Sequence, residues 1–225
     1  MPLNRLLSPF REFGFGVGLL YVLDRALRQF SSRASLHLYE FVAQPVPAGP
    51  LLPAAYRQQI RWSEVGPGSP EIGLMPRPAE VIEARFRQGA VCIAVRRKEQ
   101  FIGYVWFCAE RYHEDEVRCV YRLVSPRTTV FDFDFFLFPE HRLGRAFAAV
   151  WDAANEHLRS RGIEHTLSRI SRFNLASRQA HARLNTRVLG QALFLRWGRW
   201  QACFSRRLSP AWLQLSLDGE AELRV

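Results

Sequence analysis

The residues best suited to chemistry lie between an apolar, strand-like run, Thr129–Phe138, and the helix that we expect after it. The connecting segment is Pro139-Glu-His-Arg-Leu-Gly-Arg-Ala146. The first amides of a helix have no partners within the helix and carry the positive end of its dipole. Gly144 lets the backbone approach a ligand closely, and Arg142 and Arg145 add positive charge. These features predict a phosphate-binding site, although an ordinary strand-to-helix turn with surface arginines has the same pattern.

Two carboxylates, Asp132 and Asp134, interrupt the same apolar run. Residues two apart on a regular strand point to one face of a sheet. Because the rest of the run is mostly aromatic, we expect the two carboxylates to be partly desolvated. Desolvation favours the protonated form of a carboxyl group and makes it a better general base. The alternatives are a solvated face, or carboxylates paired with nearby arginines.

The hydrophobic pattern predicts the elements that would position these residues. The predicted strands cover residues 36–42, 91–96, 101–108, 117–123, 129–138, 165–171, 191–195 and 197–204. The predicted helices cover residues 78–87, 143–161 and 174–184. Antiparallel hairpins come first, and a strand–helix–strand–helix unit follows. This order predicts an α/β fold with a mixed sheet.

The N-terminal segment, residues 1–34, is expected to be a helical extension of a domain formed by residues 35–225. Its apolar stretch, residues 13–23, is too short to span a bilayer. Residues 13–30 together predict a helix with one apolar face. Such a helix packs on its own domain or on a partner, or it makes a peripheral contact with a membrane surface through its apolar face.

The composition is that of a globular protein. The chain has 225 residues, 48% of them hydrophobic, and a formal net charge of +10. It is therefore not a disordered chain, a collagen-like repeat or a disulfide-dense miniprotein. Its four cysteines form no CxxC pair, which predicts buried thiols in a reducing compartment, no metal centre and a cytoplasmic location, at the inner face of a membrane if the helix binds one. Scattered arginines without a recognition signature do not predict nucleic-acid binding.

The segment His141-Arg-Leu-Gly-Arg-Ala146 is similar to a motif of the general N-acetyltransferase (GNAT) superfamily, Gln/Arg-x-x-Gly-x-Gly/Ala. Gly144 and Ala146 match, and His141 stands in the first position. A second segment, Asn174-Leu-Ala-Ser177, resembles the family's Asn-x-x-Ala/Ser. With the hairpins before them, the resemblance covers roughly residues 35–205. It implies a GNAT-like fold, with a mixed, mostly antiparallel central sheet flanked by helices.

The resemblance implies acetyl-CoA, or a longer acyl-CoA, as co-substrate and no metal. It places the pyrophosphate on the turn formed by His141, Arg142, Leu143, Gly144, Arg145 and Ala146. It places the pantetheine arm along the backbone of Phe136, Leu137 and Phe138, in contact with Asn174 and Ser177.

Transfer of an acyl group to an amine needs a base that takes a proton. GNAT enzymes often carry a carboxylate base on the strand before the motif, about six residues before its end. Asp132 lies six residues before Phe138, which favours it over Asp134. His181 stands where the family often has a tyrosine that protonates the leaving thiolate, so His181 is the candidate acid. The alternative for His181 is a histidine on the surface or at the end of a helix.

The predicted function is acyl-CoA-dependent N-acyl transfer, of acetyl to a small-molecule amine or hydroxyl, by direct attack on the thioester. One alternative is a long-chain acyltransferase that uses acyl-CoA or an acidic acyl carrier protein at a membrane surface. Another is a GNAT-fold protein that binds CoA without catalysis, since His141, His181 and Asn185 depart from the family's pattern. The sequence does not identify the acceptor.

Overall fold

The computed structural model describes residues 3–207 and 212–225, and of residues 3–7 it describes the backbone alone. The first two residues of the predicted extension therefore lie outside the described part. The chain forms two compact units. One unit contains Met1–Gln44, His113–Val124 and Arg169–Val225, and the other contains Pro45–Tyr112 and Ser125–Ser168. Below they are called the first and the second unit.

The second unit is built on strands in the order β8-β7-β4-β3-β2. These are β2 (Ile60–Val65), β3 (Val91–Arg97), β4 (Gln100–Cys108), β7 (Thr129–Leu137) and β8 (His165–Ser171), of which β8 ends in the first unit. Only β7 and β8 are parallel; the other neighbours pair antiparallel. The helices are α3 (Ala54–Arg57), η1 (Pro70–Leu74), α4 (Ala79–Arg87), η2 (Pro139–His141) and α5 (Ala146–Ser160).

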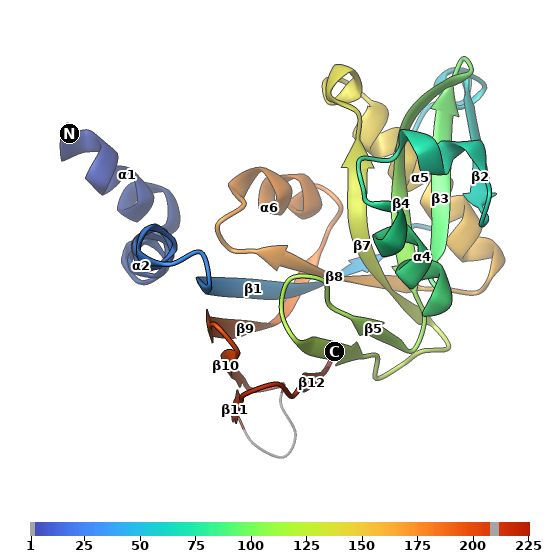
Figure 1. Ribbon diagram of the computed structural model, residues 1–225. Coiled ribbons are helices and arrows are strands. Elements are labelled where there is room, and N and C mark those ends of the chain that lie inside the picture. Colours follow the sequence, from blue (N-terminus) through green and yellow to red (C-terminus); the bar gives the residue numbers. More distant parts are fainter. Residues whose placement is uncertain (1–2, 208–211) are drawn as a thin grey trace. The chain divides into compact units, whose positions relative to one another are not determined.

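Helices cover both faces of this sheet, with α4 in front and α5 behind in the view of Figure 1. Phe86 of α4 packs on Trp106 of β4, with 5.1 Å between ring centroids. Phe135 of β7 stacks on Trp151 of α5 at 5.6 Å. Gly162, with φ +72°, follows α5 as expected of a glycine at a helix C-terminus. The core therefore consists of two aromatic layers, one on each side of β4 and β7.

The first unit contains an antiparallel sheet in the order β11-β10-β9-β1. Its elements are α1 (Leu3–Phe13), α2 (Phe15–Phe30), β1 (Ala34–Pro45), β6 (Cys119–Arg122), α6 (Leu175–Ala182), β9 (Arg187–Trp197), β10 (Trp200–Ser205), β11 (Leu213–Ser216) and β12 (Ala221–Arg224). β12 pairs parallel with β6, and β5 (Arg111–His113) carries the chain from the second unit into the first.

The N-terminal extension forms two helices, α1 and α2. Asp24 of α2 is buried, and its Oδ1 accepts a hydrogen bond from the Leu36 amide at 2.8 Å. Tyr21 packs edge-on against Phe173 at 5.4 Å. These contacts support the alternative in which the extension packs on its own domain. No helix in residues 3–207 or 212–225 is long and apolar enough to cross a membrane.

The predicted fold class, α/β with a mixed, mostly antiparallel sheet flanked by helices and preceded by N-terminal helices, is confirmed. The boundary between residues 34 and 35 stays a prediction. The helix predicted from residue 143 begins at Ala146, because Gly144 takes a left-handed conformation before it. β2, β11 and β12 were not predicted, since they are short and mix polar with apolar residues.

Candidate active site

A β-bulge in β7 shapes the strand that carries the two carboxylates. Tyr104 of β4 pairs with Phe136, and Trp106 pairs with Phe133, so Asp134 and Phe135 together face the single residue between them on β4. Asp134 has φ +48°, a left-handed conformation that aspartate tolerates better than most residues. A bulge of this kind reverses the alternation of side chains along the strand.

The bulge separates Asp132 from Asp134. Phe133 stacks on Trp106 on the side of α4, whereas Phe135 packs against α5. Alternation along the regular part of β7 directs Asp132 to the α5 side, and Asp134 bonds to an arginine of α4. The expectation that the two carboxylates share a face is therefore wrong, because it assumed a regular strand.

Asp134 is bound by two guanidinium groups. Arg85 of α4 donates to its Oδ2, and Arg77 donates through Nε at 2.9 Å and through Nη2. The side chains of Asp134 and Arg85 are only 6% and 3% exposed. The arginine-paired alternative thus holds for Asp134, whose carboxylate fixes α4 and the segment before it against the bulge.

This ion pair has a measurable stability consequence. Arg85→Met removes the buried partner and leaves the Asp134 carboxylate with the partly exposed Arg77. We expect it to lower the free energy of unfolding by about 3 kcal/mol, the lower end of the loss for breaking a buried pair. Arg77→Met removes a side chain that is 37% exposed and is expected to cost about 1 kcal/mol or less. Urea denaturation of both variants measures the difference. A small, equal loss for both would contradict the structural role assigned to Arg85.

Asp132 is buried where β7 and β8 stop pairing. Both of its oxygens lie 2.8 Å from the Oγ of Ser168, which donates to the carboxylate. The last pair between the strands joins Asp132 to Ser168, and β7 then continues to Leu137. The carboxylate thus sits beside a stretch of β7 at which an extended ligand could bond to the strand edge.

The turn after β7 leads into α5, and the first turn of this helix contains no acidic residue. Gly144 has φ +85°, and a Cβ built on it would meet nothing within 4 Å. Within residues 3–207 and 212–225, no acceptor is hydrogen-bonded to the backbone amides of Leu143, Gly144, Arg145 and Ala146. Unpaired amides at a helix start form an anion-binding site.

The two arginines of the turn are exposed and rest on aromatic rings. Arg142 donates from Nε to the carbonyl of Leu137 at 3.1 Å, and its guanidinium lies 5.9 Å from the ring of Phe136. The Arg145 guanidinium lies 5.7 Å from the ring of Tyr56. The ring contacts hold both charges near the turn without an acidic partner in the described structure.

The other residues from the end of β7 to α5 differ in whether their backbone groups are free to bond to a ligand. The Phe138 amide donates to the carbonyl of Ile102 at 3.2 Å, and the Phe138 carbonyl accepts from the His141 amide at 2.9 Å. The backbone of Phe138 is therefore already bonded, whereas Leu137 uses its carbonyl for the side chain of Arg142. His141 lies at the last position of η2 and is half-buried.

In the first unit, Asn174 caps the N-terminus of α6. Asn174 Oδ1 accepts from the Ser177 amide at 3.0 Å. His181 is buried, and its Nδ1 lies 2.8 Å from the Ser177 carbonyl. Because a carbonyl only accepts, Nδ1 is the protonated nitrogen in this arrangement. Asn185, which aligns with a glycine of the GNAT motif, has φ +57°.

The acidity of His113-Glu-Asp-Glu116 predicts a solvated connection, and for Glu114 this prediction is wrong. Its side chain is fully buried and accepts from Arg169 Nε and Nη2 at 2.8 and 2.6 Å. Arg172 likewise donates to buried Glu40 at 2.6 Å. Both arginines beside β8, which are candidates for a phosphate contact on sequence grounds, thus neutralise carboxylates of the first unit.

Tyr104 and Trp106, whose rings could line an acceptor pocket on sequence grounds, belong to the core. Tyr104 and Trp106 are fully buried, and burial raises the pKa of the Tyr104 hydroxyl. The four cysteines are buried thiols, and burial raises the pKa of Cys203 to about 12. In the described part of the chain, no group of three His, Cys, Asp or Glu side chains could hold a metal ion.

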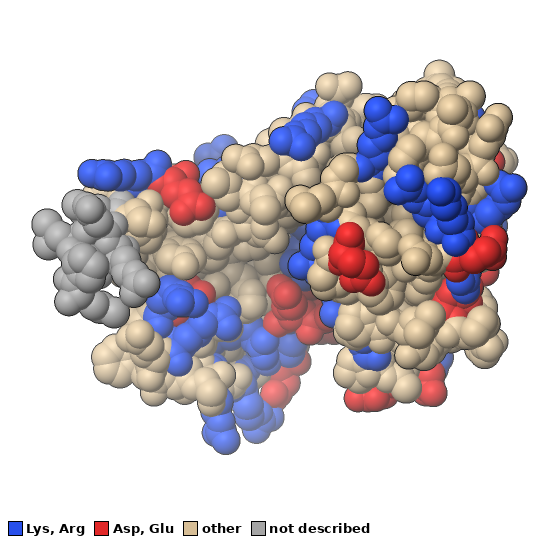
Figure 2. Space-filling view, turned by 90° about the horizontal axis from the view of Figure 1, so that it is seen from above, with Lys and Arg blue, Asp and Glu red and all other residues tan. Residues whose placement is uncertain are grey.

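Charge on the visible surface does not indicate a nucleic-acid interface. In the space-filling view, Lys and Arg side chains are scattered over the face shown and several lie beside acidic groups (Figure 2). Polyanion-binding proteins instead gather their basic side chains along one face.

No protein-family model and no curated protein matches the chain. Among solved structures, it is similar to a putative GNAT-family acetyltransferase from Novosphingobium aromaticivorans, at 10% identity and a TM-score of 0.48, covering 72% of this chain and 64% of that one. A tandem GNAT protein from the clavulanic acid biosynthesis pathway is 13% identical, with a TM-score of 0.48 and coverage of 76% and 57%.

A functionally unknown conserved protein from Staphylococcus epidermidis is 10% identical, with a TM-score of 0.49 and coverage of 79% of this chain and 67% of that one. The chain thus spans about two thirds or less of the length of these three proteins. The family printed for two of them is the same family that the two sequence motifs resemble.

Proposed function

We propose that the protein is an acyl-CoA-dependent N-acyltransferase in which an acceptor amine attacks the thioester directly. The observation that carries the proposal is the turn between β7 and α5. Its four unpaired amides, its open glycine and its two exposed arginines suit the pyrophosphate of CoA. The edge of β7 beyond Asp132 suits the amide groups of the pantetheine arm.

In the proposed reaction, the amine nitrogen forms a bond to the thioester carbonyl carbon and loses a proton to a base. The C–S bond then breaks, and the thiolate takes up a proton. We assign the base to Asp132, which accepts from the neutral Ser168 hydroxyl, whereas both oxygens of Asp134 bind guanidinium groups. The Ser168 hydroxyl can relay the proton to Asp132.

The proposed acid is His181. We assign it this role because it stands where GNAT enzymes often have the tyrosine that protonates the leaving thiolate, and an imidazolium can supply a proton. His181→Gln is expected to slow acyl transfer about 10-fold to 100-fold and to leave the KM for acyl-CoA nearly unchanged. A full rate in steady-state kinetics would assign His181 a structural role only.

A thiol-release assay with acetyl-CoA and a long-chain acyl-CoA, across a panel of small amines, tests the proposal. Because the four protein thiols are buried, the thiol reagent of the assay reacts with the released CoA rather than with the protein. We expect amine-dependent release and an N-acyl product by mass spectrometry. Saturable CoA binding without release for any acceptor would favour the non-catalytic alternative.

A second candidate, long-chain acyl transfer at a membrane surface, is favoured by α2. Phe15, Leu19, Leu23 and Phe30 lie along α2 and are all exposed. The first three are four residues apart and share one helix face. This function predicts faster turnover with a long-chain than with an acetyl donor. The net charge of +10 also suits an acidic acyl carrier protein as donor.

A further inference from the structure

Over residues 193–197, 200–204 and 213–215, one face of the sheet formed by β9, β10 and β11 is apolar. Cross-strand partners point to the same face, and here Leu195 pairs with Ala202, which in turn pairs with Leu215. Trp197 pairs with Trp200, and Leu193 with Phe204. We call this surface the apolar face and define it by Leu193, Leu195, Trp197, Trp200, Phe204 and Leu215.

The apolar face is open, although the opposite face of the same strands is already covered. Phe194 and Cys203 on the opposite face are buried. On the apolar face, Trp197, Trp200 and Leu215 are 55%, 60% and 67% exposed. A contiguous apolar surface of this kind marks an interaction site rather than ordinary solvent-facing sheet.

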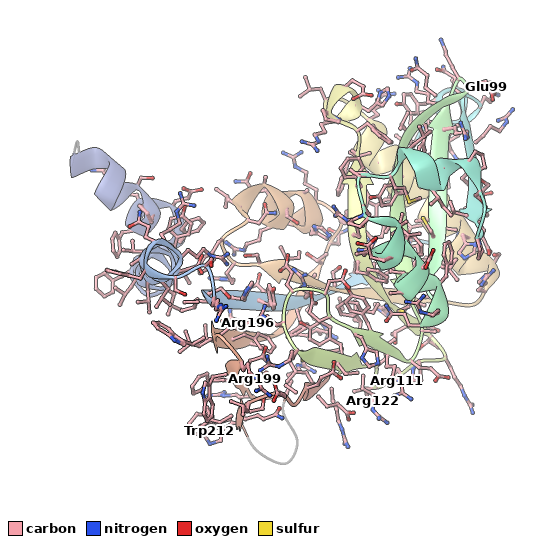
Figure 3. All side chains as sticks on the ribbon, in the orientation of Figure 1. Glu99, Arg111, Arg122, Arg196, Arg199 and Trp212 are labelled. Carbon is pink, nitrogen blue, oxygen red and sulfur yellow. The ribbon has the colours of Figure 1, made fainter. Side chains whose placement is uncertain are left out.

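Positive charge borders one end of the apolar face. There, a pocket of about 1090 Å³ is lined by Leu193, Phe204 and Trp212 and by three arginines, and no carboxylate is among its described lining residues. The three arginines are Arg206, Arg207 and Arg224. Trp212 is 66% exposed, and its ring lies 6.3 Å from that of Phe204. Figure 3 shows the side chain of Trp212 next to β11. The surface therefore joins aromatic groups to guanidinium groups.

We propose that the apolar face docks on the surface of an anionic lipid bilayer. Tryptophan favours the membrane–water interface, because its ring is apolar and its N–H remains a donor. Arginine pairs well with headgroup phosphate. A second copy of this chain would bring another arginine-bordered face and a further net charge of +10, which repel. The proposal is independent of acyl transfer and of the stripe on α2.

Vesicle co-sedimentation of the full chain tests this surface. We expect binding to vesicles of phosphatidylglycerol and phosphatidylcholine and little binding to phosphatidylcholine alone. The double variant Trp200→Ser, Leu215→Ser should bind the anionic vesicles at least about tenfold more weakly. The matched control is Leu74→Ser, which alters a leucine of the second unit that is 56% exposed and should bind normally. Unchanged binding by the double variant, or equal binding to neutral vesicles, would overturn the proposal.

Quenching by brominated lipids locates the contact and avoids dependence on one variant's folding. Trp197→Phe, Trp200→Phe should keep most of the vesicle binding and lose much of the bromine quenching. If Leu19→Ser, Leu23→Ser on α2 abolishes binding and the tryptophans of the apolar face are not quenched, the membrane contact lies on α2 and the proposal is wrong. A lipid-free dimer in sedimentation velocity that Trp200→Ser dissociates would assign the face to a second copy instead.

Discussion

Replacing Asp132 by asparagine is expected to lower kcat about 100-fold to 1000-fold, with acyl-CoA affinity within about twofold of the wild type. Asparagine has nearly the same shape, and its Oδ1 can still accept from the Ser168 hydroxyl. It cannot take up the proton that the attacking amine loses. Steady-state kinetics gives kcat, and calorimetry of the same preparation gives the affinity.

Asp134→Asn is the matched control, because it makes the same chemical change two residues away. It weakens the contacts with Arg77 and Arg85, so it should lower the melting temperature clearly and the rate of acyl transfer only slightly. A full rate for Asp132→Asn would contradict the assigned base. A large loss of rate in Asp134→Asn at unchanged stability would move the base to Asp134.

Replacing Gly144 by valine is expected to weaken CoA binding at least about tenfold. At φ +85° a β-branched side chain is strongly disfavoured, so the turn must change its conformation and redirect its amides. No neighbouring atom lies within 4 Å of the position that a Cβ would occupy, so backbone strain rather than a packing clash produces the effect. Calorimetric titration with CoA measures the loss.

Gly68→Val controls for strain alone. Gly68 has φ +90°, lies in the second unit and likewise leaves open space, with no atom within 4 Å, where a Cβ would stand. Its valine variant should lose a similar amount of stability and keep CoA affinity. Equal losses of affinity in the two variants would show that Gly144 acts through folding and not through the turn.

Local signals were sufficient to predict the elements of the strand–helix–strand–helix unit. These signals are the apolar run of β7, the apolar stripe of α5 and Gly162 after that helix, and each depends on residues close together in the sequence. α6 begins where the sequence predicted it, because the side chain of Asn174 accepts from an amide only three residues away. The left-handed conformation of Gly144 likewise agrees with the motif that singled it out.

Features that depend on distant residues could not be predicted. The bulge in β7 exists only relative to the register of β4, so it reversed the expected orientation of Asp134. The two arginines that bind Asp134 lie 49 and 57 residues away in the sequence, and Arg169 bonds to Glu114 over a separation of 55 residues. A single sequence gives no signal for such pairs, and Arg85 was therefore missed.

The C-terminal strands show a different limit. Apolar residues on both faces of β9 are typical of a strand that is buried on both sides. The structure instead leaves Trp197 of β9, and Trp200 opposite it on β10, exposed. The hydrophobic pattern alone does not distinguish a face covered by the same chain from a face that stays exposed.

The most direct test of the proposed function compares CoA with pantetheine, which has the same thiol arm but no phosphate. Calorimetry of the wild type should show saturable, one-site binding of CoA and at least about tenfold weaker binding of pantetheine. In Gly144→Val the difference should largely disappear, because the turn that holds the pyrophosphate is disturbed. Absence of CoA binding, or equal affinity for the two compounds, would contradict a phosphate site at the start of α5.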